Sequence, residues 1–250
     1  MSFSTLMYHE IREKANFDPN HPSSIEVKQD YADILPSFLF VTLEHFEEQM
    51  AYLNDNNYHT LSLEEVKDYY YKNIKPVEKS VLLTFDDCYQ SIKKYAYPVL
   101  KKYHFHAVAF AVTSWLHETP KQFDPDKSVC MAESDLADIA DVFEFANHTD
   151  SFHTRMNDTT SIIMVECDEE FSNDLDCCNK RKYVSGKDVF AYPFGLYNER
   201  NLSLLKNKGF LLAFTSDNGI NDDNTNPLLL YRNAIPYFID LEAFKKLLGE

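Results

Sequence analysis

Two adjacent carboxylates follow an apolar run in the stretch SVLLTFDDC, which covers residues 80–88. Asp86 and Asp87 lie together at the end of a predicted strand, where each negative charge raises the cost of ionising the other. Such a pair is useful when one acid holds a cation and the other accepts a proton. Considered alone, the pair is also compatible with a solvated turn or a helix cap.

Two histidines lie five residues apart in the polar segment NHTDSFHT, residues 147–154. On a helix this spacing would separate His148 from His153, but in a turn after a strand both imidazoles can approach one ion. Two histidines and one carboxylate suit Zn²⁺ or a similar divalent ion, with positions left for water and substrate. The remaining carboxylate could then act as the general base of a metal-assisted hydrolysis. Considered alone, two histidines in a polar loop are also compatible with side chains that are exposed to solvent and bind no metal.

Polar or turn residues also follow other predicted strands. His9 ends the segment STLMYH, and Pro193 to Gly195 follow the segment VFAY. In barrels of parallel strands joined by helices, reactive groups gather at the C-terminal ends of the strands. The sequence therefore predicts that these residues share one site with the carboxylates and the histidines.

Strand-like and helix-like segments alternate along nearly the whole chain. Helical spacing predicts, among others, one long amphipathic helix over residues 159–181. The alternation is typical of parallel strands with helical crossovers, and the length suits a single domain, residues 1–250, that closes as an α/β barrel. Strands are predicted at residues 4–9, 80–85, 107–112, 143–148, 189–193 and 210–215.

The composition limits the possible partners and compartments. The 250 residues carry a formal charge of −16, which counts against nucleic acid and anionic membrane surfaces as partners because phosphates would be repelled. Five cysteines without paired spacing indicate reduced thiols. The sequence shows no signal peptide and no membrane span, so we expect a cytoplasmic chain, or an extracellular or cell-surface one if a signal has been removed.

Three motifs resemble, in order and spacing, those of the polysaccharide deacetylases, the NodB-type carbohydrate esterases of family four: TFDDC (84–88), HTDSFH (148–153) and FAYPFG (190–195). The similarity extends from His9 to about Pro236. The wide histidine spacing and the segment MYHEI (7–11) are most similar to the branch that deacetylates poly-N-acetylglucosamine in biofilms. The resemblance implies a distorted (β/α) barrel of about seven parallel strands that removes acetyl groups from N-acetylated amino sugars.

The resemblance also implies a role for each motif residue. Asp87 would be the carboxylate ligand of the metal, His148 and His153 its imidazole ligands, and Asp86 the general base. Zinc is the expected metal, and Co²⁺, Ni²⁺ and Mn²⁺ accept the same ligands. In the biofilm branch the general acid comes from an N-terminal Tyr-His pair, so His9 would protonate the leaving amine with a pKa near neutrality.

The third motif would supply the oxyanion site and part of the substrate groove. The turn after Tyr192 would offer a backbone N–H to the developing oxyanion. Tyr192, Pro193 and Phe194 would border the groove, which the loop over residues 17–36 and the segment over residues 119–134 would shape further. The expected partner is an acetylated amino sugar or oligosaccharide, and the sequence does not determine the oligomeric state.

The sequence departs from the family pattern at three places. Cys88 stands where the first motif usually ends in glycine, so a positive φ there would strain the chain. We expect a small buried residue, with a metal ligand or redox switch as the alternative. Ala191 stands where many members carry an arginine that orients the base, and Arg232 could replace part of that charge. The late Leu-x-His motif, which usually supplies the general acid, is absent.

Two alternative functions stay open at this point. The first is an esterase that removes O-acetyl groups from a polysaccharide such as xylan, with the same metal and base. An easier leaving group would make His9 less important to that reaction. The second is a catalytically silent carbohydrate-binding paralogue, which Cys88 and Ala191 motivate. The retained metal triad and both carboxylates count against it.

Overall fold

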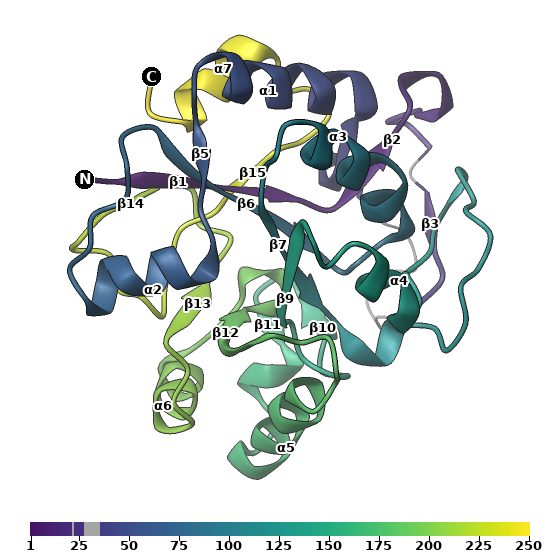
Figure 1. Cartoon of the computed structure of the whole chain (residues 1–250). Coiled ribbons are helices and arrows are strands. Elements are labelled where there is room, and N and C mark those ends of the chain that lie inside the picture. The colour runs from purple at the N-terminus through teal and green to yellow at the C-terminus, as the bar shows by residue number, and fades with distance from the viewer. Residues whose placement is uncertain (22, 28–35) are drawn as a thin grey trace.

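The structure of the protein is a computed structural model that describes residues 1–21, 23–27 and 36–250. Within these residues, a nine-stranded sheet forms the centre of the molecule, with helices around it (Figure 1). Parts of the predicted loop over residues 17–36 lie outside the described residues. The strands of the sheet are β1 (Phe3–Tyr8), β5 (His59–Thr60), β6 (Ser80–Asp86), β7 (Ala107–Ala111), β9 (Phe143–Asn147), β12 (Gly186–Ala191), β13 (Leu212–Phe214), β14 (Ile220–Asn221) and β15 (Asn233–Ala234).

The sheet is mostly parallel. Its order is β13-β12-β9-β7-β6-β1-β14, with β15 also beside β1 and the short β5 beside β6. Strands β13, β12, β9, β7, β6, β1 and β15 form one parallel series, and only β14 pairs antiparallel at the edge of the described sheet. These seven strands confirm the predicted α/β fold.

The segment from Leu230 to Ala234 joins the two edges of the sheet. The backbone of Leu230 hydrogen-bonds to Ala213 at 2.8 Å and to Thr215 at 2.9 Å, at the end of β13. Three residues later, β15 pairs with β1. Because this closing segment contains only two residues of regular strand, the barrel is distorted.

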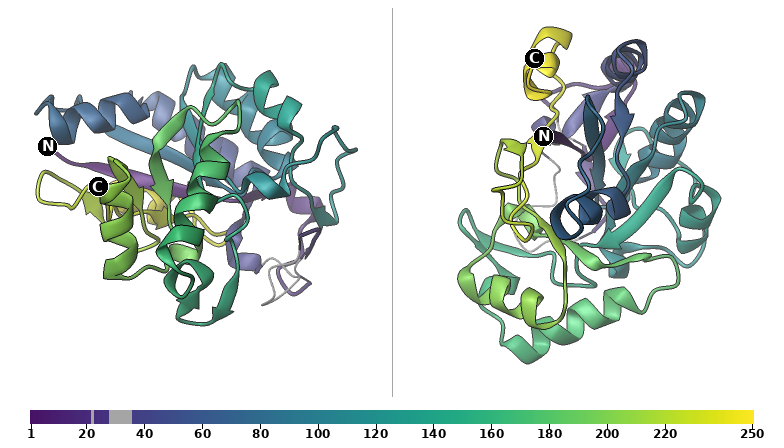
Figure 2. Two further views of the ribbon diagram at one scale, coloured as in Figure 1. Left: turned by 90° about the horizontal axis from the view of Figure 1, so that it is seen from below. Right: turned by 60° about the vertical axis from the view of Figure 1, so that its left-hand side comes forward.

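Helices cover the outside of the curled sheet, as the two further views also show (Figure 2). Shorter strands lie around it: β2 (Glu10–Arg12) pairs with β4 (Phe40–Thr42), β3 (Ser24–Ile25) with β8 (Lys127–Ser128), and β10 (Arg155–Asn157) with β11 (Thr160–Ser161). A π-helical turn, Ile92–Ala96, precedes α3. The α-helices are α1 (Leu43–Asp55), α2 (Leu63–Tyr71), α3 (Tyr97–Lys102), α4 (Glu133–Asp138), α5 (Asp168–Asn179), α6 (Glu199–Asn207) and α7 (Leu241–Leu247).

The long helix predicted over residues 159–181 is wrong in its first half. The chain there forms β11, a 3-10 turn over Ile162–Met164 and only then α5. Tertiary hydrogen bonds explain the difference, because side chains of α6 satisfy the carbonyls of this segment. Asn201 donates to the carbonyl of Ile163 at 2.6 Å, and Arg200 donates to the carbonyls of Ile163 and Glu166.

The period of two in each strand separates the inner and outer faces of the barrel. One buried apolar cluster includes Leu82 of β6, Phe110 of β7, Ala146 of β9 and Phe214 of β13, together with residues of α2. A second cluster packs the opposite face of the sheet against α1, α3 and α7. Asp86 is four residues after Leu82, so its side chain lies on the same inner face of the barrel. It is a charged residue at the end of this apolar lining.

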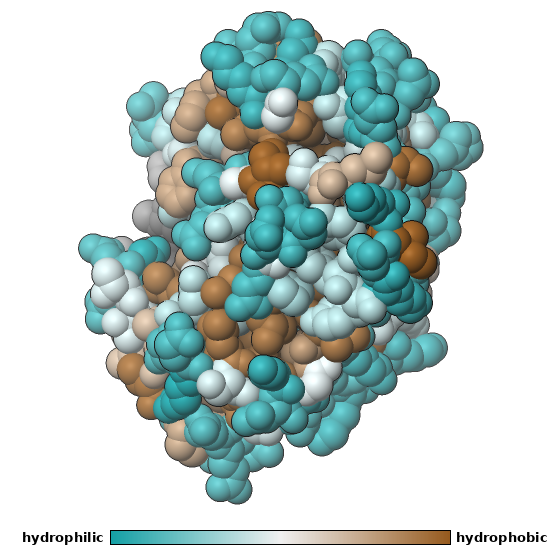
Figure 3. Space-filling view, turned by 90° about the vertical axis from the view of Figure 1, so that its left-hand side faces the viewer, coloured by the Kyte–Doolittle hydropathy of each residue, from teal (hydrophilic) through white to brown (hydrophobic). Residues whose placement is uncertain are grey.

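The face on the side of the N-terminus is largely hydrophilic, with hydrophobic patches between the polar groups (Figure 3). The exposed large apolar residues include Met1, Ile74, Val77 and Ile220. Among the helices of residues 1–21, 23–27 and 36–250, none has the length and apolar character that crossing a bilayer requires.

Candidate active site

The two carboxylates lie where β6 ends, and the backbone leaves the strand through a left-handed turn. Asp87 has φ +68° and Cys88 has φ +54°. Such a conformation costs roughly 1–2 kcal/mol for a residue other than glycine. The N–H of Asp87 donates to the carbonyl of Phe110 at 3.0 Å, which holds the turn against β7. As a result, two consecutive carboxylates are buried at the mouth of the barrel instead of pointing to opposite faces of a strand.

Asp86 forms a buried ion pair with Arg232, which lies in the segment that closes the barrel. Arg232 Nη1 is 2.6 Å from Asp86 Oδ1, and its Nε donates to the carbonyl of Thr215 at 2.8 Å. Burial raises the pKa of Asp86, but the charge of Arg232 and the neighbouring imidazoles lower it to about 2. Asp86 is therefore ionised at neutral pH. Arg232 supplies the guanidinium beside it that the alanine at position 191 cannot supply.

The two histidines leave the end of β9 and turn toward the carboxylates. His148 Nδ1 donates to the carbonyl of Ala191 at 2.8 Å, so its Nε2 carries the free lone pair. That Nε2 lies 3.8 Å from Asp87 Oδ1, and the Nε2 of His153 lies 3.5 Å from the same oxygen. Burial lowers the pKa of both imidazoles. Both rings are thus neutral, which is the form that binds a metal.

Asp87, His148 and His153 fit a metal ion by their donor atoms and their surroundings. Each offers one ligand atom, and the three atoms lie within 4.8 Å of one another. Ligand atoms of a tetrahedral zinc ion are about 3.4 Å apart, close to the two separations measured to Asp87. Asp87 Oδ1 is buried without a hydrogen-bond partner among the described residues. Burial and the charge of Asp86 raise the pKa of Asp87 to about 8, and a cation would reverse that effect.

Aromatic rings enclose His153 on two sides. The ring centroid of Trp115 lies 4.7 Å from that of His153, and the centroid of Phe194 lies 4.4 Å from it. Phe194 has φ +59° in the turn after β12, and Pro193 beside it is buried. The sequence prediction did not include Trp115. The sequence contains a signal that could have identified Trp115, since it is the only tryptophan and follows the predicted strand over residues 107–112.

Tyr192 does not border the site, contrary to the sequence prediction. Its side chain is fully buried, and its hydroxyl donates to the carbonyl of Leu228 at 3.0 Å. The reason is the alternation of side chains at the end of β12. Tyr192 shares a face with Phe190, and both pack into the cluster that α5 and α6 cover, which includes Phe171 and Leu205.

His9 lies beside Asp86, directly after the end of β1. Its Nε2 is 3.7 Å from Asp86 Oδ2, and its side chain is 12% exposed. Burial lowers the pKa of His9 to about 4, although the charge of Asp86 opposes this shift. The expected pKa near neutrality is therefore wrong for this environment, and the resting imidazole is neutral at pH 7.

Cys88 adopts the positive φ expected to strain it, and its side chain is fully buried. Its Sγ lies 3.8 Å from the carbonyl of Phe110. Burial raises the pKa of the thiol well above its usual value. A protonated, buried thiol supports the expectation of a small core residue rather than a ligand or a redox switch.

Known proteins share both the sequence pattern and this architecture. Residues 73–213 match the family model of the polysaccharide deacetylases. A poly-beta-1,6-N-acetyl-D-glucosamine N-deacetylase of Staphylococcus aureus (strain MSSA476) is 29% identical over 237 residues, which cover 92% of this chain and 77% of that protein. The protein of that name in Staphylococcus epidermidis is 27% identical over 255 residues, with 98% and 81% covered.

The fold is also that of a solved deacetylase structure. The Streptococcus pyogenes deacetylase PplD, determined in complex with acetate, matches with a TM-score of 0.77 and 24% identity over 99% of this chain and 98% of that one. At this identity the likeness shows the shared fold. The family model covers more than half of the chain and contains the carboxylate and histidine motifs. The chain belongs to the polysaccharide deacetylase family.

Proposed function

We propose that this protein is a metal-dependent N-deacetylase that removes acetyl groups from N-acetylglucosamine units of a polysaccharide or its oligosaccharides. The observation that carries the proposal is the convergence of five groups at one end of the barrel. A buried ionised carboxylate, Asp86, lies beside a metal-binding constellation and beside the partly exposed His9. The names of the staphylococcal relatives suggest the sugar and its β-1,6 linkage. We further propose that residues 1–250 work as one domain.

Asp87, His148 and His153 are the proposed ligands of the ion. The family is metal-dependent, and we propose zinc because two imidazoles and one carboxylate form its usual catalytic donor set. When bound, such an ion acts as a Lewis acid on an acetyl carbonyl and lowers the pKa of the water it contacts. Cobalt, nickel and manganese would accept the same donors.

Asp86 is the proposed general base. Arg232 keeps it ionised and fixes one of its oxygens at 2.6 Å, so the other oxygen is available to accept a proton from the attacking water. His9 Nε2 lies 3.7 Å from that second oxygen. Because the resting imidazole is neutral, we propose that His9 takes up the proton during turnover and delivers it to the leaving amine.

The turn after β12 is the proposed oxyanion and groove element. Pro193 has no N–H, and the N–H groups of Tyr192, Gly195 and Leu196 donate to the carbonyls of Phe214, Tyr192 and Pro193. We therefore assign the oxyanion contact to the N–H of Phe194. Its ring and Pro193 would border the bound sugar, and the fully buried Tyr192 would only support the turn.

Acetate release tests the proposal. Chelated protein receives stoichiometric Zn²⁺, and acetate is measured with β-1,6-linked N-acetylglucosamine oligomers and, in parallel, with O-acetylated xylan. We expect metal-dependent release from the amide substrate and loss of that release in Asp86→Asn. Release from the ester alone would make the protein an O-acetyl esterase. Bound metal with no release from either substrate would support a silent carbohydrate-binding paralogue.

A further inference from the structure

We infer that Asp174 of helix α5 is a positioning residue that holds the loop between His148 and His153 in the conformation that binds the metal. The inference rests on the proposed metal site. Asp174 is 5% exposed, and its hydrogen bonds go to residues other than the two histidines. Its carboxylate instead accepts four hydrogen bonds from the residues between them. It accepts from the N–H of Asp150 at 2.8 Å, the N–H of Ser151 at 2.8 Å, the hydroxyl of Ser151 at 3.0 Å and the N–H of Phe152 at 3.1 Å.

The loop depends on an external acceptor because of its backbone. Thr149 has φ +77°, and three consecutive N–H groups follow it, at residues 150–152, whose acceptor is a side chain and not a backbone carbonyl. One carboxylate accepts from all three, and hydrogen bonds to an ionised acceptor are about twice as strong as neutral ones. The wide histidine spacing thus creates a turn whose donors are satisfied by α5 rather than within the loop.

The two histidines differ in how they are held, and this difference makes Asp174 important for one of them. His148 is oriented directly, by the bond from its Nδ1 to the carbonyl of Ala191. The Nδ1 of His153 is buried without a hydrogen-bond partner among the described residues. A metal-binding histidine usually donates its second nitrogen to an acceptor that fixes the ring. His153 lacks that support, so the backbone of its loop must place the ring, together with the contacts from Trp115 and Phe194.

Helix α5 also holds the start of the same loop. The side chain of Asn147 accepts from the N–H of Thr149 at 2.8 Å, and it donates to the carbonyl of Leu175 at 3.0 Å and to Asn179 at 2.9 Å. Leu175 follows Asp174 directly, so one stretch of α5 contacts the loop at both ends. Asp174 is the charged member of this arrangement.

The test replaces Asp174 with its isosteric amide. Asp174→Asn keeps the size of the side chain but turns one acceptor into a donor that faces other donors. We expect the dissociation constant for Zn²⁺, measured by competition with a chromophoric chelator, to rise about 10- to 100-fold. We also expect the visible spectrum of the Co²⁺-substituted protein to change, since it reports the geometry of the ligands. Asp176→Asn is the matched control, because Asp176 lies on the same helix, half exposed, and pairs with Lys208 at 2.7 Å.

A lower melting temperature of Asp174→Asn with unchanged zinc affinity and cobalt spectrum would overturn the inference, because Asp174 would then only stabilise the fold. If this variant does not fold, Ser151→Ala removes one of the four bonds at an exposed residue. Its zinc affinity should weaken about 2- to 10-fold, and unchanged affinity overturns the inference equally. Wild-type protein that binds zinc but releases no acetate would contradict the proposed function alone. Wild-type protein that binds no divalent metal would contradict both.

Discussion

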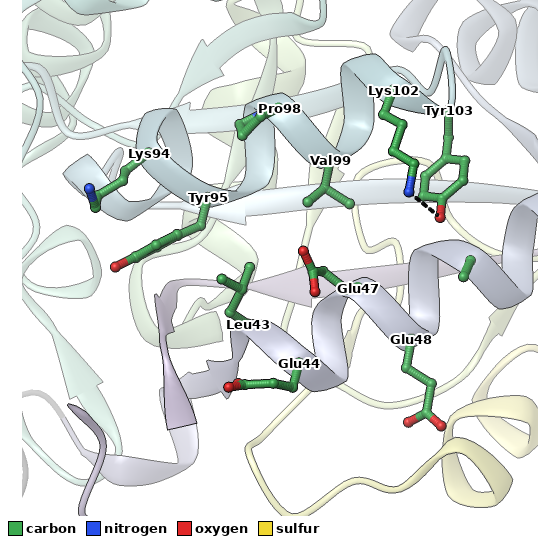
Figure 4. A pocket seen from close by; sticks show the side chains of 11 residues that line it. Leu43, Glu44, Glu47, Glu48, Lys94, Tyr95, Pro98, Val99, Lys102 and Tyr103 are labelled. Atoms are coloured by element: carbon green, nitrogen blue, oxygen red, sulfur yellow. Dashed lines mark hydrogen bonds between the residues drawn. The ribbon is translucent and has the colours of Figure 1, made fainter. Parts of the chain in front are cut away.

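Two charged regions of this molecule differ in what their charges do. At the mouth of the barrel, Asp86 and Asp87 are at most 4% exposed and face buried partners. Between α1 and α3 lies an open groove of about 650 Å³, where Glu44, Glu47 and Lys102 are all exposed (Figure 4). Water solvates the charges of this groove. A catalytic centre requires charges that the fold has desolvated and directed at one point.

The difference also appears in the polar atoms left without partners. The carboxylate Oδ1 of Asp87 and the Nδ1 of His153 are buried and unpartnered among the described residues. In the groove, Lys102 contacts the hydroxyl of its neighbour Tyr103 at 3.1 Å, and Val99 faces Glu47 across the gap. Leaving a buried acceptor without a hydrogen bond costs about 1–3 kcal/mol of folding free energy. Such an atom is therefore a candidate for contact with a ligand. Exposed groups carry no such cost and imply no ligand.

The largest expected effect comes from substituting the two carboxylates one at a time. Asp86→Asn should lower kcat/KM for acetate release about 10²- to 10⁴-fold, because it removes the general base, and it should leave a stoichiometric metal ion bound. Asp87→Asn should lose the ion itself. Metal content by elemental analysis, beside steady-state kinetics, distinguishes the two variants. Equal metal loss in both would show that the carboxylates share one role, contrary to the proposal.

The next effect concerns the stability of the same region. Arg232→Gln leaves the carboxylate of Asp86 buried without its cation and should lower the free energy of unfolding by about 3–5 kcal/mol. Urea denaturation of the metal-free protein measures the change. Lys72→Gln is the control, since the exposed Lys72 follows the end of α2 and pairs with the partly exposed Asp68 at 2.6 Å, and we expect little shift of its midpoint. Similar shifts in the two variants would contradict the distinction between buried and solvated charge.

The sequence was sufficient to predict the barrel, and the meeting of the carboxylates and histidines at one end of it, because their signals are local. Asp86 and Asp87 directly follow a buried strand, and His148 directly follows another, so parallel topology alone brings them to one end. The roles of Asp174 and Trp115 depend on long-range contacts. Asp174 is one of several acidic residues on α5, and its sequence context is that of a solvated helix position, whereas in the fold it hydrogen-bonds to the loop between the histidines.

Two predictions about the site failed because the tertiary environment outweighed a local pattern. Tyr192 belongs to a motif at the site, yet the alternation along β12 sends its ring into the core. His9 was expected to titrate near neutrality, but burial lowers its pKa to about 4. Neither the face of a side chain at a strand end nor the depth of its burial can be read from residue type and spacing.

A smaller effect is expected from His9, and it depends on the substrate. His9→Ala should reduce kcat/KM about 10²-fold with an N-acetylated oligomer, because an amine leaves poorly unless it is protonated. An aryl acetate ester, whose leaving group needs no proton, should react within a few-fold of the wild-type rate. The ratio of the two rates is the measurement. Equal losses on amide and ester would contradict the role of general acid and leave His9 as a partner of Asp86.

The smallest effect is expected in the groove between α1 and α3. The double variant Glu47→Gln with Lys102→Gln removes one charge of each sign, so the net charge of the protein stays the same. Both residues are exposed, and such substitutions usually change stability by less than about 0.5 kcal/mol. We expect unchanged kcat/KM at every oligomer length. A loss that grows with the length of the oligomer would show that the groove binds sugar units beyond the reacting one, and the two regions would then form one continuous binding surface despite their different burial.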